Sequence, residues 1–175
     1  MKNVILVGYR CTGKTSVGKE LSKKLGRPFI DTDELIALET GMSVDETVQK
    51  GGWPLFRQKE RDVIMQISSM EGHIIATGGG AFENPKNGDV LRENCLFVWL
   101  TADTNTIVGR MLSDRKSINQ RPPLSDDDLE IETALIIKRR EPVYCQLADL
   151  TIDTSQKEID LIVDNICVFL KNGTD

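Results

Sequence analysis

Short apolar runs alternate along this chain with longer stretches in which apolar residues recur every three or four positions. Five of the runs are short enough to be strands buried on both faces, and they cover residues 4–7, 28–30, 73–77, 96–100 and 150–152. The stretches with helical spacing include residues 13–25, 104–113, 129–140 and 159–170. Because strands alternate with helices, the pattern predicts a three-layer α/β/α fold around a parallel five-stranded sheet.

Residues that start or stop helices refine this prediction. Ser43 and Glu46 have the spacing of a capping box, and Pro54 fits the first turn of a longer helix. On that helix Phe56, Val63, Ile67 and Met70 form an apolar stripe, and Arg57 and Glu60 are expected to lie off it. Pro142 is expected to end the helix before it and restart the chain.

The first strand is followed by a specific motif. Residues 8–15 read GYRCTGKT, which is G-x-x-x-x-G-K-T between a strand and a helix. Such glycines let backbone N–H groups point at phosphate oxygens, and the helix adds the positive end of its dipole. Lys14 can reach the β- and γ-phosphates, and the Thr15 hydroxyl can bind Mg²⁺. A glycine turn with a solvated lysine is the alternative, but the flanking strand and helix favour a nucleoside triphosphate site.

Polar residues follow two further strands. Asp31 and Asp33 are two positions apart at the end of the second strand, so their side chains are expected to face one space. Three glycines, residues 78–80, follow the third strand, and they indicate that the backbone approaches something closely. Asp33 has an alternative role as the cap of a helix that begins at Glu34.

The composition excludes several classes of protein. With 175 residues the chain fits one domain, and its net charge of −5 argues against a nucleic-acid binder. No apolar run reaches membrane-spanning length, and the first strand begins too early for a signal peptide. Four well-separated cysteines and a single histidine make a zinc site improbable. We therefore expect reduced thiols in a cytoplasmic protein without nucleic-acid or membrane partners. We also expect the protein to be a monomer.

The chain resembles the shikimate kinases, within the group of small kinases that are similar to nucleoside-monophosphate kinases. The resemblance runs from the first strand to the last and depends on motifs at residues 8–15, 31–33, 56–60, 78–80, 121–124 and 140–144. It implies one kinase domain over residues 1–175, with sheet order 2-3-1-4-5. It also implies an acceptor-binding region at residues 34–60 and a mobile lid at residues 113–128 that closes over ATP.

By this resemblance the protein transfers the γ-phosphate of ATP to the 3-hydroxyl of shikimate, a step of aromatic amino acid biosynthesis. Arg121 would stabilise the transferring group as a catalytic residue beside Lys14 and Asp33. Mg²⁺ would be held by Thr15 and Asp31. ATP would be bound by Cys11, Thr12, Gly13, Lys14, Thr15, Ser16, Arg115, Arg121 and Gln156. Cys11 occupies a position where the family more often has glycine.

The acceptor is expected on the other side of the transferring phosphate. The resemblance assigns its hydroxyls to Asp33, its carboxylate to Arg57 and Arg140, and backbone contacts to Gly79 and Gly80. Forked guanidinium groups suit a planar carboxylate. The arginines could instead be solvated helix-surface charges, and the glycines could serve only a tight turn.

Two other functions fit parts of the pattern. Another small-metabolite kinase, such as a gluconate kinase, would also need an aspartate for hydroxyl groups but would share the carboxylate clamp less closely. A non-catalytic nucleotide-sensing module would keep the fold and lose turnover, and Lys14, Asp33, Arg121 and Arg140 are the positions expected to degenerate first. All four are present.

Overall fold

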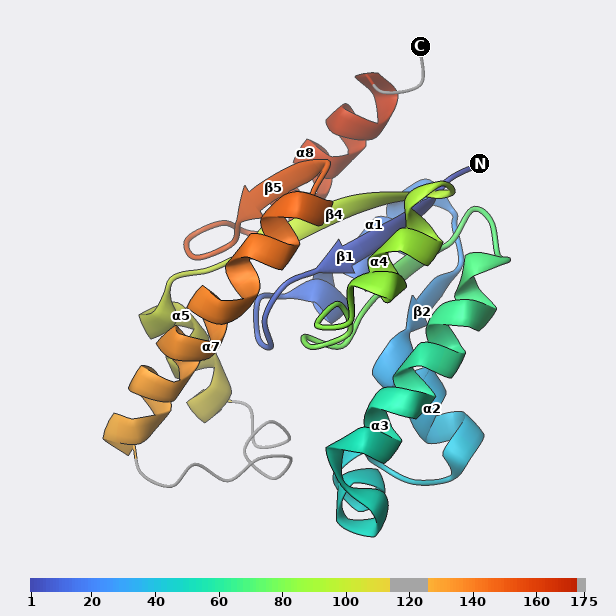
Figure 1. The fold of residues 1–175 in the computed structure, drawn as a ribbon. Coiled ribbons are helices and arrows are strands. Elements are labelled where there is room, and N and C mark those ends of the chain that lie inside the picture. The colour runs from blue at the N-terminus through green and yellow to red at the C-terminus, as the bar shows by residue number, and fades with distance from the viewer. Residues whose placement is uncertain (114–125, 173–175) are drawn as a thin grey trace.

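The protein is described by a computed structural model that covers residues 1–113 and 126–172. Its strands form one parallel sheet in the order β2-β3-β1-β4-β5 (Figure 1). They are β1 (Asn3–Val7), β2 (Phe29–Asp31), β3 (Ile74–Ala76), β4 (Cys95–Thr101) and β5 (Leu150–Asp153). The predicted fold class, strand number and strand order are confirmed.

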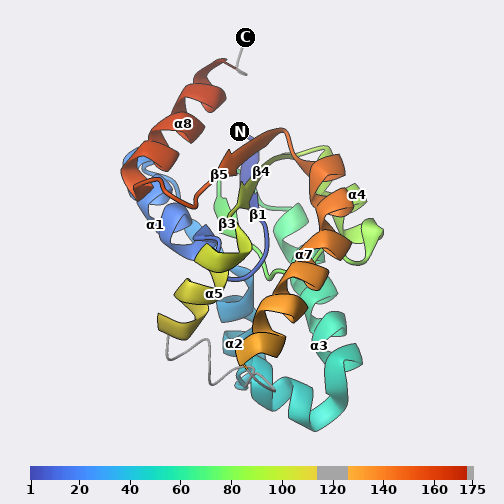
Figure 2. The same ribbon diagram turned by 90° about the vertical axis from the view of Figure 1, so that its left-hand side faces the viewer.

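Helices cover both faces of the sheet and make three layers. Figure 2 shows α1 and α8 together on one side of the strands, with α3, α4 and α7 on the other. The helices are α1 (Lys14–Leu25), α2 (Thr32–Thr40), α3 (Val44–Ser68), α4 (Pro85–Arg92), α5 (Thr104–Ser113), α7 (Asp126–Leu147) and α8 (Ile159–Asn172). In the described parts of the chain, no helix is both long and apolar enough to cross a membrane.

Strand β1 lies at the centre of the sheet, between β3 and β4, and all five of its residues are buried. Val4 and Leu6 belong to the apolar cluster under α1 and α8. Ile5 and Val7 belong to the cluster under α3 and α4. Burying a side chain of this size contributes about 1.5–3 kcal/mol, so β1 is a rigid support for the loop that follows it.

The predicted helix boundaries are correct for α3 and wrong at Pro142 in α7. The predicted Ser43–Glu46 capping box is present. Non-helical Gly52 interrupts α3 just before Pro54, which agrees with the prediction that Pro54 stands in the first turn of a longer helix. Helix α7, however, runs without a break through Pro142, so the predicted restart there is wrong. Arg140 and Tyr144 are buried on either side of this proline. Their packing offsets the cost of a proline inside a helix, which is about 3 kcal/mol.

The carboxyl ends of the central strands meet at one edge of the sheet. Leu6 pairs with Ala76, and Asp31 pairs with Ala76 from the other side. The loop after β1, the aspartates after β2 and the glycines after β3 therefore start next to one another. In an open α/β sheet this edge is where ligands bind.

Candidate active site

The loop between β1 and α1 has a backbone that only small or strained residues can adopt. Gly8 has a φ of 140°, and a Cβ there would lie 2.3 Å from the carbonyl oxygen of Leu100. Gly13 has a φ of 94° and caps α1. Cys11 is the one non-glycine residue with positive φ among the described residues, at 59°. For a residue with a side chain, this left-handed conformation is unfavourable by roughly 1–2 kcal/mol of free energy. Cys11 therefore adopts the backbone shape of the loop with some strain.

Two side chains hold the loop from inside. The Thr12 hydroxyl and the Lys14 ammonium group donate hydrogen bonds of 2.8 and 2.7 Å to the carbonyl oxygen of Tyr9. Lys14 is only 8% exposed. Burial lowers the pKa of Lys14 to about 8, and the nearby carboxylates of Asp33 and Asp31 oppose this shift. The ammonium group therefore keeps its charge below about pH 8 in a position where few waters screen it.

Arg110 and Thr154 hold the same loop from outside. Arg110 donates to the carbonyl oxygen of Cys11 over 3.1 Å and to that of Thr154 over 2.7 Å. The Thr154 hydroxyl donates to the carbonyl oxygen of Thr12 over 3.0 Å. In a trans peptide the N–H points away from the carbonyl. The N–H groups of Thr12 and Gly13 are thereby turned toward the inside of the loop, as an anion-binding loop requires.

A groove runs beside this loop toward the end of β5. Its polar and small lining residues are Cys11, Thr12, Gly13, Ser16, Arg110, Thr154 and Lys157. Val17, Ile159 and Ile162 supply apolar surface. Gln156 lies in the same loop as Lys157 but is exposed and does not line the groove.

Asp31 connects the loop to the second strand. Its Oδ2 accepts a 2.8 Å hydrogen bond from the Thr15 hydroxyl. Its Oδ1 accepts bonds from the backbone N–H groups of Asp33 and Glu34, which makes Asp31 the cap of α2. The alternative in which Asp33 caps a helix from Glu34 is therefore wrong. The carboxylate of Asp33 instead lines a pocket.

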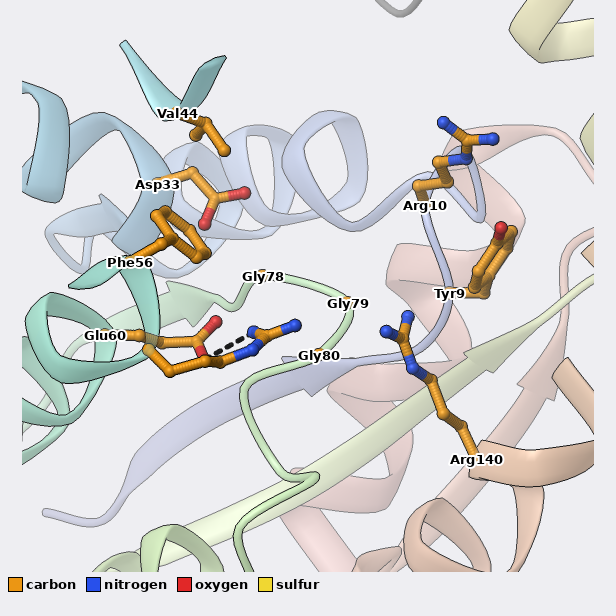
Figure 3. Close-up of a pocket in the computed structure, with 11 residues that line it drawn as sticks. Tyr9, Arg10, Asp33, Val44, Phe56, Glu60, Gly78, Gly79, Gly80 and Arg140 are labelled. Carbon is orange, nitrogen blue, oxygen red and sulfur yellow. Dashed lines mark hydrogen bonds and ion pairs between the residues drawn. The ribbon is translucent and has the colours of Figure 1, made fainter. Parts of the chain in front are cut away.

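This pocket is separate from the groove, since the two share no lining residue. Figure 3 shows Val44, Asp33, Phe56 and Glu60 on one side of it and Arg10, Tyr9 and Arg140 on the other. The glycines 78–80 curve between the two sides. The full lining is Tyr9, Arg10, Asp33, Val44, Phe56, Arg57, Glu60, Gly78, Gly79, Gly80 and Arg140.

The three glycines let charged side chains approach the backbone. A Cβ on Gly78 would lie 2.7 Å from Oδ1 of Asp33, and a Cβ on Gly80 would lie 2.2 Å from Nη2 of Arg57. The N–H of Gly78 donates to the Thr32 hydroxyl over 3.0 Å. The prediction that this backbone approaches something closely is confirmed, since the neighbours include the charged groups of the pocket.

Arg57 and Glu60 form an ion pair at the base of the pocket. Arg57 Nη1 lies 2.6 Å from Glu60 Oε2, and the Glu60 side chain is 1% exposed. Burial raises the pKa of Glu60 to about 7, although the charge of Arg57 opposes the shift. Glu60 shares the buried face of α3 with Phe56, Val63 and Ile67, so the prediction that it lies off the apolar stripe is wrong.

Arg140 enters the pocket from α7. Its side chain is 9% exposed, and its Nε and Nη2 atoms lie 2.8 and 2.7 Å from Oε1 of Glu83. Its guanidinium carbon lies 5.8 Å from the centre of the Tyr9 ring. One turn further along α7, the Tyr144 hydroxyl donates to the carbonyl oxygen of Gly79, and burial raises the pKa of Tyr144 to about 12. Helix α7 thus fixes both an arginine and the glycine loop.

Comparisons with known proteins identify relatives of this chain. The model of the shikimate kinase family matches residues 10–171. The chain is 45% identical to the shikimate kinase of Syntrophus aciditrophicus, over 94% of this chain and 89% of that protein. The chain belongs to the shikimate kinase family.

Solved structures of shikimate kinases have the same fold. The enzyme from Acinetobacter baumannii in complex with shikimate is 31% identical, with a TM-score of 0.90 over 100% of this chain and 96% of that chain. The enzyme from Bacteroides thetaiotaomicron is 26% identical, with a TM-score of 0.89 over 97% of this chain and 98% of that one. The likeness to shikimate kinases inferred from the motifs is confirmed.

The residues that the family resemblance assigned fall into two groups in space. Asp33, Arg57, Gly79, Gly80 and Arg140 come from separate segments and line one pocket. Cys11, Thr12, Gly13 and Ser16 line the groove, with Lys14 and Thr15 between them in sequence. Arg115, Arg121 and residues 114–125 of the predicted lid lie outside the described residues.

Several residues at the site of this shikimate kinase family member were not predicted. Glu60 stands three residues after Arg57, and that helical i,i+3 spacing was a visible sign of an ion pair. Arg110, Thr154 and Glu83 gave no such sign. Each acts on residues far away in the sequence, and only the folded chain brings them together.

Proposed function

We propose that this protein is a shikimate kinase that transfers the γ-phosphate of ATP to the 3-hydroxyl of shikimate. The observation that carries the proposal is the pocket in which Asp33, Arg57 and Arg140 come together beside the phosphate-binding loop. The similarity to a protein solved in complex with shikimate supports the same acceptor. The acceptor carries one carboxylate and three hydroxyl groups, which matches two arginines and an aspartate.

On the donor side, the phosphates of ATP would lie in the loop of residues 8–15. Inward N–H groups, the N-terminus of α1 and the buried Lys14 charge all favour anions there. Lys14 would leave the Tyr9 carbonyl and contact the β- and γ-phosphates. The groove lined by Arg110, Thr154 and Lys157 would receive the nucleoside. Gln156, the neighbour of Lys157 in the chain, stays a predicted ATP-binding residue.

Magnesium fits the oxygen atoms at the start of α1. Thr15 and Asp31 place a hydroxyl and a carboxylate 2.8 Å apart next to the loop. Mg²⁺ prefers oxygen ligands and usually binds through one or two protein groups, several waters and substrate phosphates. Thr15 would contribute directly and Asp31 through water. When bound, the ion would neutralise charge on the β- and γ-phosphates.

On the acceptor side, the carboxylate of shikimate would pair with Arg57 and Arg140, and Asp33 would accept hydrogen bonds from its hydroxyl groups. Gly79 and Gly80 would let the ring approach the backbone. The region of residues 34–60 would thus supply one wall of the acceptor site and α7 the other. Because the arginines hold the carboxylate of shikimate and Asp33 binds its hydroxyl groups, one hydroxyl would be directed at the γ-phosphate.

The chemical step requires positioning more than strong bases. The acceptor oxygen forms a bond to the γ-phosphorus while the bond from that phosphorus to the oxygen of ADP breaks. The hydroxyl proton would pass to Asp33, which acts as general base. Lys14 would stabilise the charge on the transferring group, and Arg121 is predicted to do the same.

A coupled assay of ADP release with a panel of acceptors tests the proposal. Shikimate should support turnover, and gluconate or a nucleoside monophosphate should give only background. Turnover with gluconate alone would identify another small-metabolite kinase. Binding of ATP without turnover on any acceptor would identify a nucleotide-sensing module.

A further inference from the structure

We propose that Glu83 is a positioning residue of the acceptor pocket, which orients the two arginines of the carboxylate clamp. Glu83 does not line the pocket, but its carboxylate contacts two arginines that do, Arg57 and Arg140. The proposal rests on the proposed function, because it concerns the way in which an acceptor carboxylate is gripped.

One carboxylate contacts three arginines from two helices. Oε1 of Glu83 lies 2.8 Å from Nη2 of Arg139 and 2.7 Å from Nη2 of Arg140, and both arginines belong to α7. Its Oε2 lies 3.7 Å from Nη2 of Arg57, which belongs to α3. Glu83 therefore links the two walls that would hold the acceptor between them.

The contacts also decide which edge of Arg140 is available. Glu83 occupies the Nε and Nη2 edge of its guanidinium group. The remaining nitrogen, Nη1, lies on the side of Gly79, where a Cβ would be 3.6 Å away. Arg57 has Glu60 on Nη1 and Glu83 near Nη2. Glu83 thus fixes one edge of Arg140 and leaves its Nη1 for a ligand, and together with Glu60 it holds the guanidinium group of Arg57 in place.

The backbone that carries Glu83 is firmly anchored. Phe82 is buried and packs edge-on against Phe97, with ring centres 5.7 Å apart. The amide of Asn87 donates to the carbonyl oxygen of Ala81 over 2.6 Å. The N–H of Glu83 itself donates to the carbonyl oxygen of Gly80 over 3.1 Å. The backbone of Glu83 is therefore fixed relative to the core and to the glycine loop.

Electrostatics favour an ionised Glu83. Burial alone would raise its pKa, but the hydrogen bond and charge of Arg140, with Arg57 and Arg139, bring the pKa below its usual value. Because the Arg140 side chain is 9% exposed, its charge needs a counter-ion, and Glu83 supplies one. Without Glu83, the three like charges would repel one another, and the side chains would lose their common orientation.

A competing role for Glu83 would change acceptor binding in the opposite direction. If Glu83 competed with the acceptor carboxylate for Arg57 and Arg140, removing its charge would strengthen acceptor binding. If it positions the arginines, removing its charge would weaken binding. Glu83→Gln separates these cases, because it keeps the size of the side chain. Glu93→Gln is the matched control, since it removes one exposed negative charge just after α4.

The experiment measures kcat and KM for shikimate and for ATP in the wild type and both variants. Glu83→Gln should raise KM for shikimate about tenfold, with kcat and KM for ATP within about twofold. Glu93→Gln should match the wild type. Glu83→Asp, which keeps the charge but retracts it, should show a smaller rise in KM and serves as the second variant if Glu83→Gln is unstable.

KM for a carboxylate-free analogue of shikimate separates a loss of arginine positioning from a general loss of order in the pocket. With this analogue, Glu83→Gln and the wild type should have the same KM, because the clamp is not engaged. An unchanged or lower KM for shikimate in Glu83→Gln, or an equal rise with the analogue, would overturn the proposal. If the wild type itself fails to phosphorylate shikimate, the proposed function fails first, and the two failures are distinguishable.

Discussion

Nη1 of Arg57 lies 2.6 Å from Oε2 of Glu60, a carboxylate that is 1% exposed and whose pKa is raised to about 7. This pair places a group that titrates near neutral pH next to the predicted carboxylate clamp. An anionic acceptor bound at Arg57 would repel the ionised form of Glu60 and raise its pKa further. By linkage, acceptor binding then takes up protons.

The first prediction concerns the pH dependence of acceptor binding. The affinity for shikimate without nucleotide should fall as pH rises from 6 to 8, because Glu60 loses its proton near pH 7. The carboxylate of shikimate stays ionised throughout this range. Titration calorimetry at several pH values is the measurement. Glu60→Gln should flatten the profile, and an affinity that rises with pH in the wild type would contradict the prediction.

The second prediction concerns the phosphate-binding loop. Lys14→Ala should lower kcat at least about 10²-fold, because it removes the charge that is proposed to contact the transferring phosphate. Lys23→Ala, an exposed change on the same helix, should leave kcat unchanged. Circular dichroism should show folded protein for both variants. Near-normal kcat in Lys14→Ala would remove this residue from the mechanism.

The third prediction concerns the clamp. Arg140→Ala should lower kcat/KM for shikimate roughly 10²-fold, since the acceptor carboxylate loses a charged partner. Binding of ATP should be nearly unchanged. Lys138→Ala, an exposed change on the same helix, is the control. Equal losses for ATP and shikimate would mean that Arg140 supports the fold of the site rather than the acceptor.

The fourth prediction uses the glycine loop. In Gly80→Ala the new methyl group would meet Arg57, whose Nη2 atom lies 2.2 Å from the position of the Cβ, and would displace that side chain. KM for shikimate should therefore rise about tenfold, with little effect on ATP. Gly109→Ala has open space around its Cβ and should behave as the wild type. Steady-state kinetics that show no change in Gly80→Ala would contradict this account of the loop.

The sequence predicted the fold well because its signals are local. An all-apolar run marks β1, Gly13 and Lys14 mark the start of α1, and the Ser43 capping box marks α3. The prediction of a helix end at Pro142 is wrong, because the packing of Arg140 and Tyr144 around it outweighs the local effect of the proline.

The site was predictable only in part, for a physical reason. Residues at strand ends, such as Asp31 and Asp33, can be assigned to the ligand edge because the parallel sheet brings these ends together. Glu60 was placed off the apolar stripe, whereas its ion pair with Arg57 allows the carboxylate to be buried. Glu83 and Arg110 orient other side chains and loops across the fold, and no spacing in the sequence encodes such contacts.

The most direct test of the central claim compares shikimate with its carboxylate-free analogue as acceptors for the wild-type protein. ADP release at saturating ATP and Mg²⁺ is measured over a range of acceptor concentrations. The clamp of Arg57 and Arg140 predicts that kcat/KM for shikimate exceeds that for the analogue about 10²-fold or more. Equal use of the two acceptors, or no turnover of shikimate above background, would contradict it.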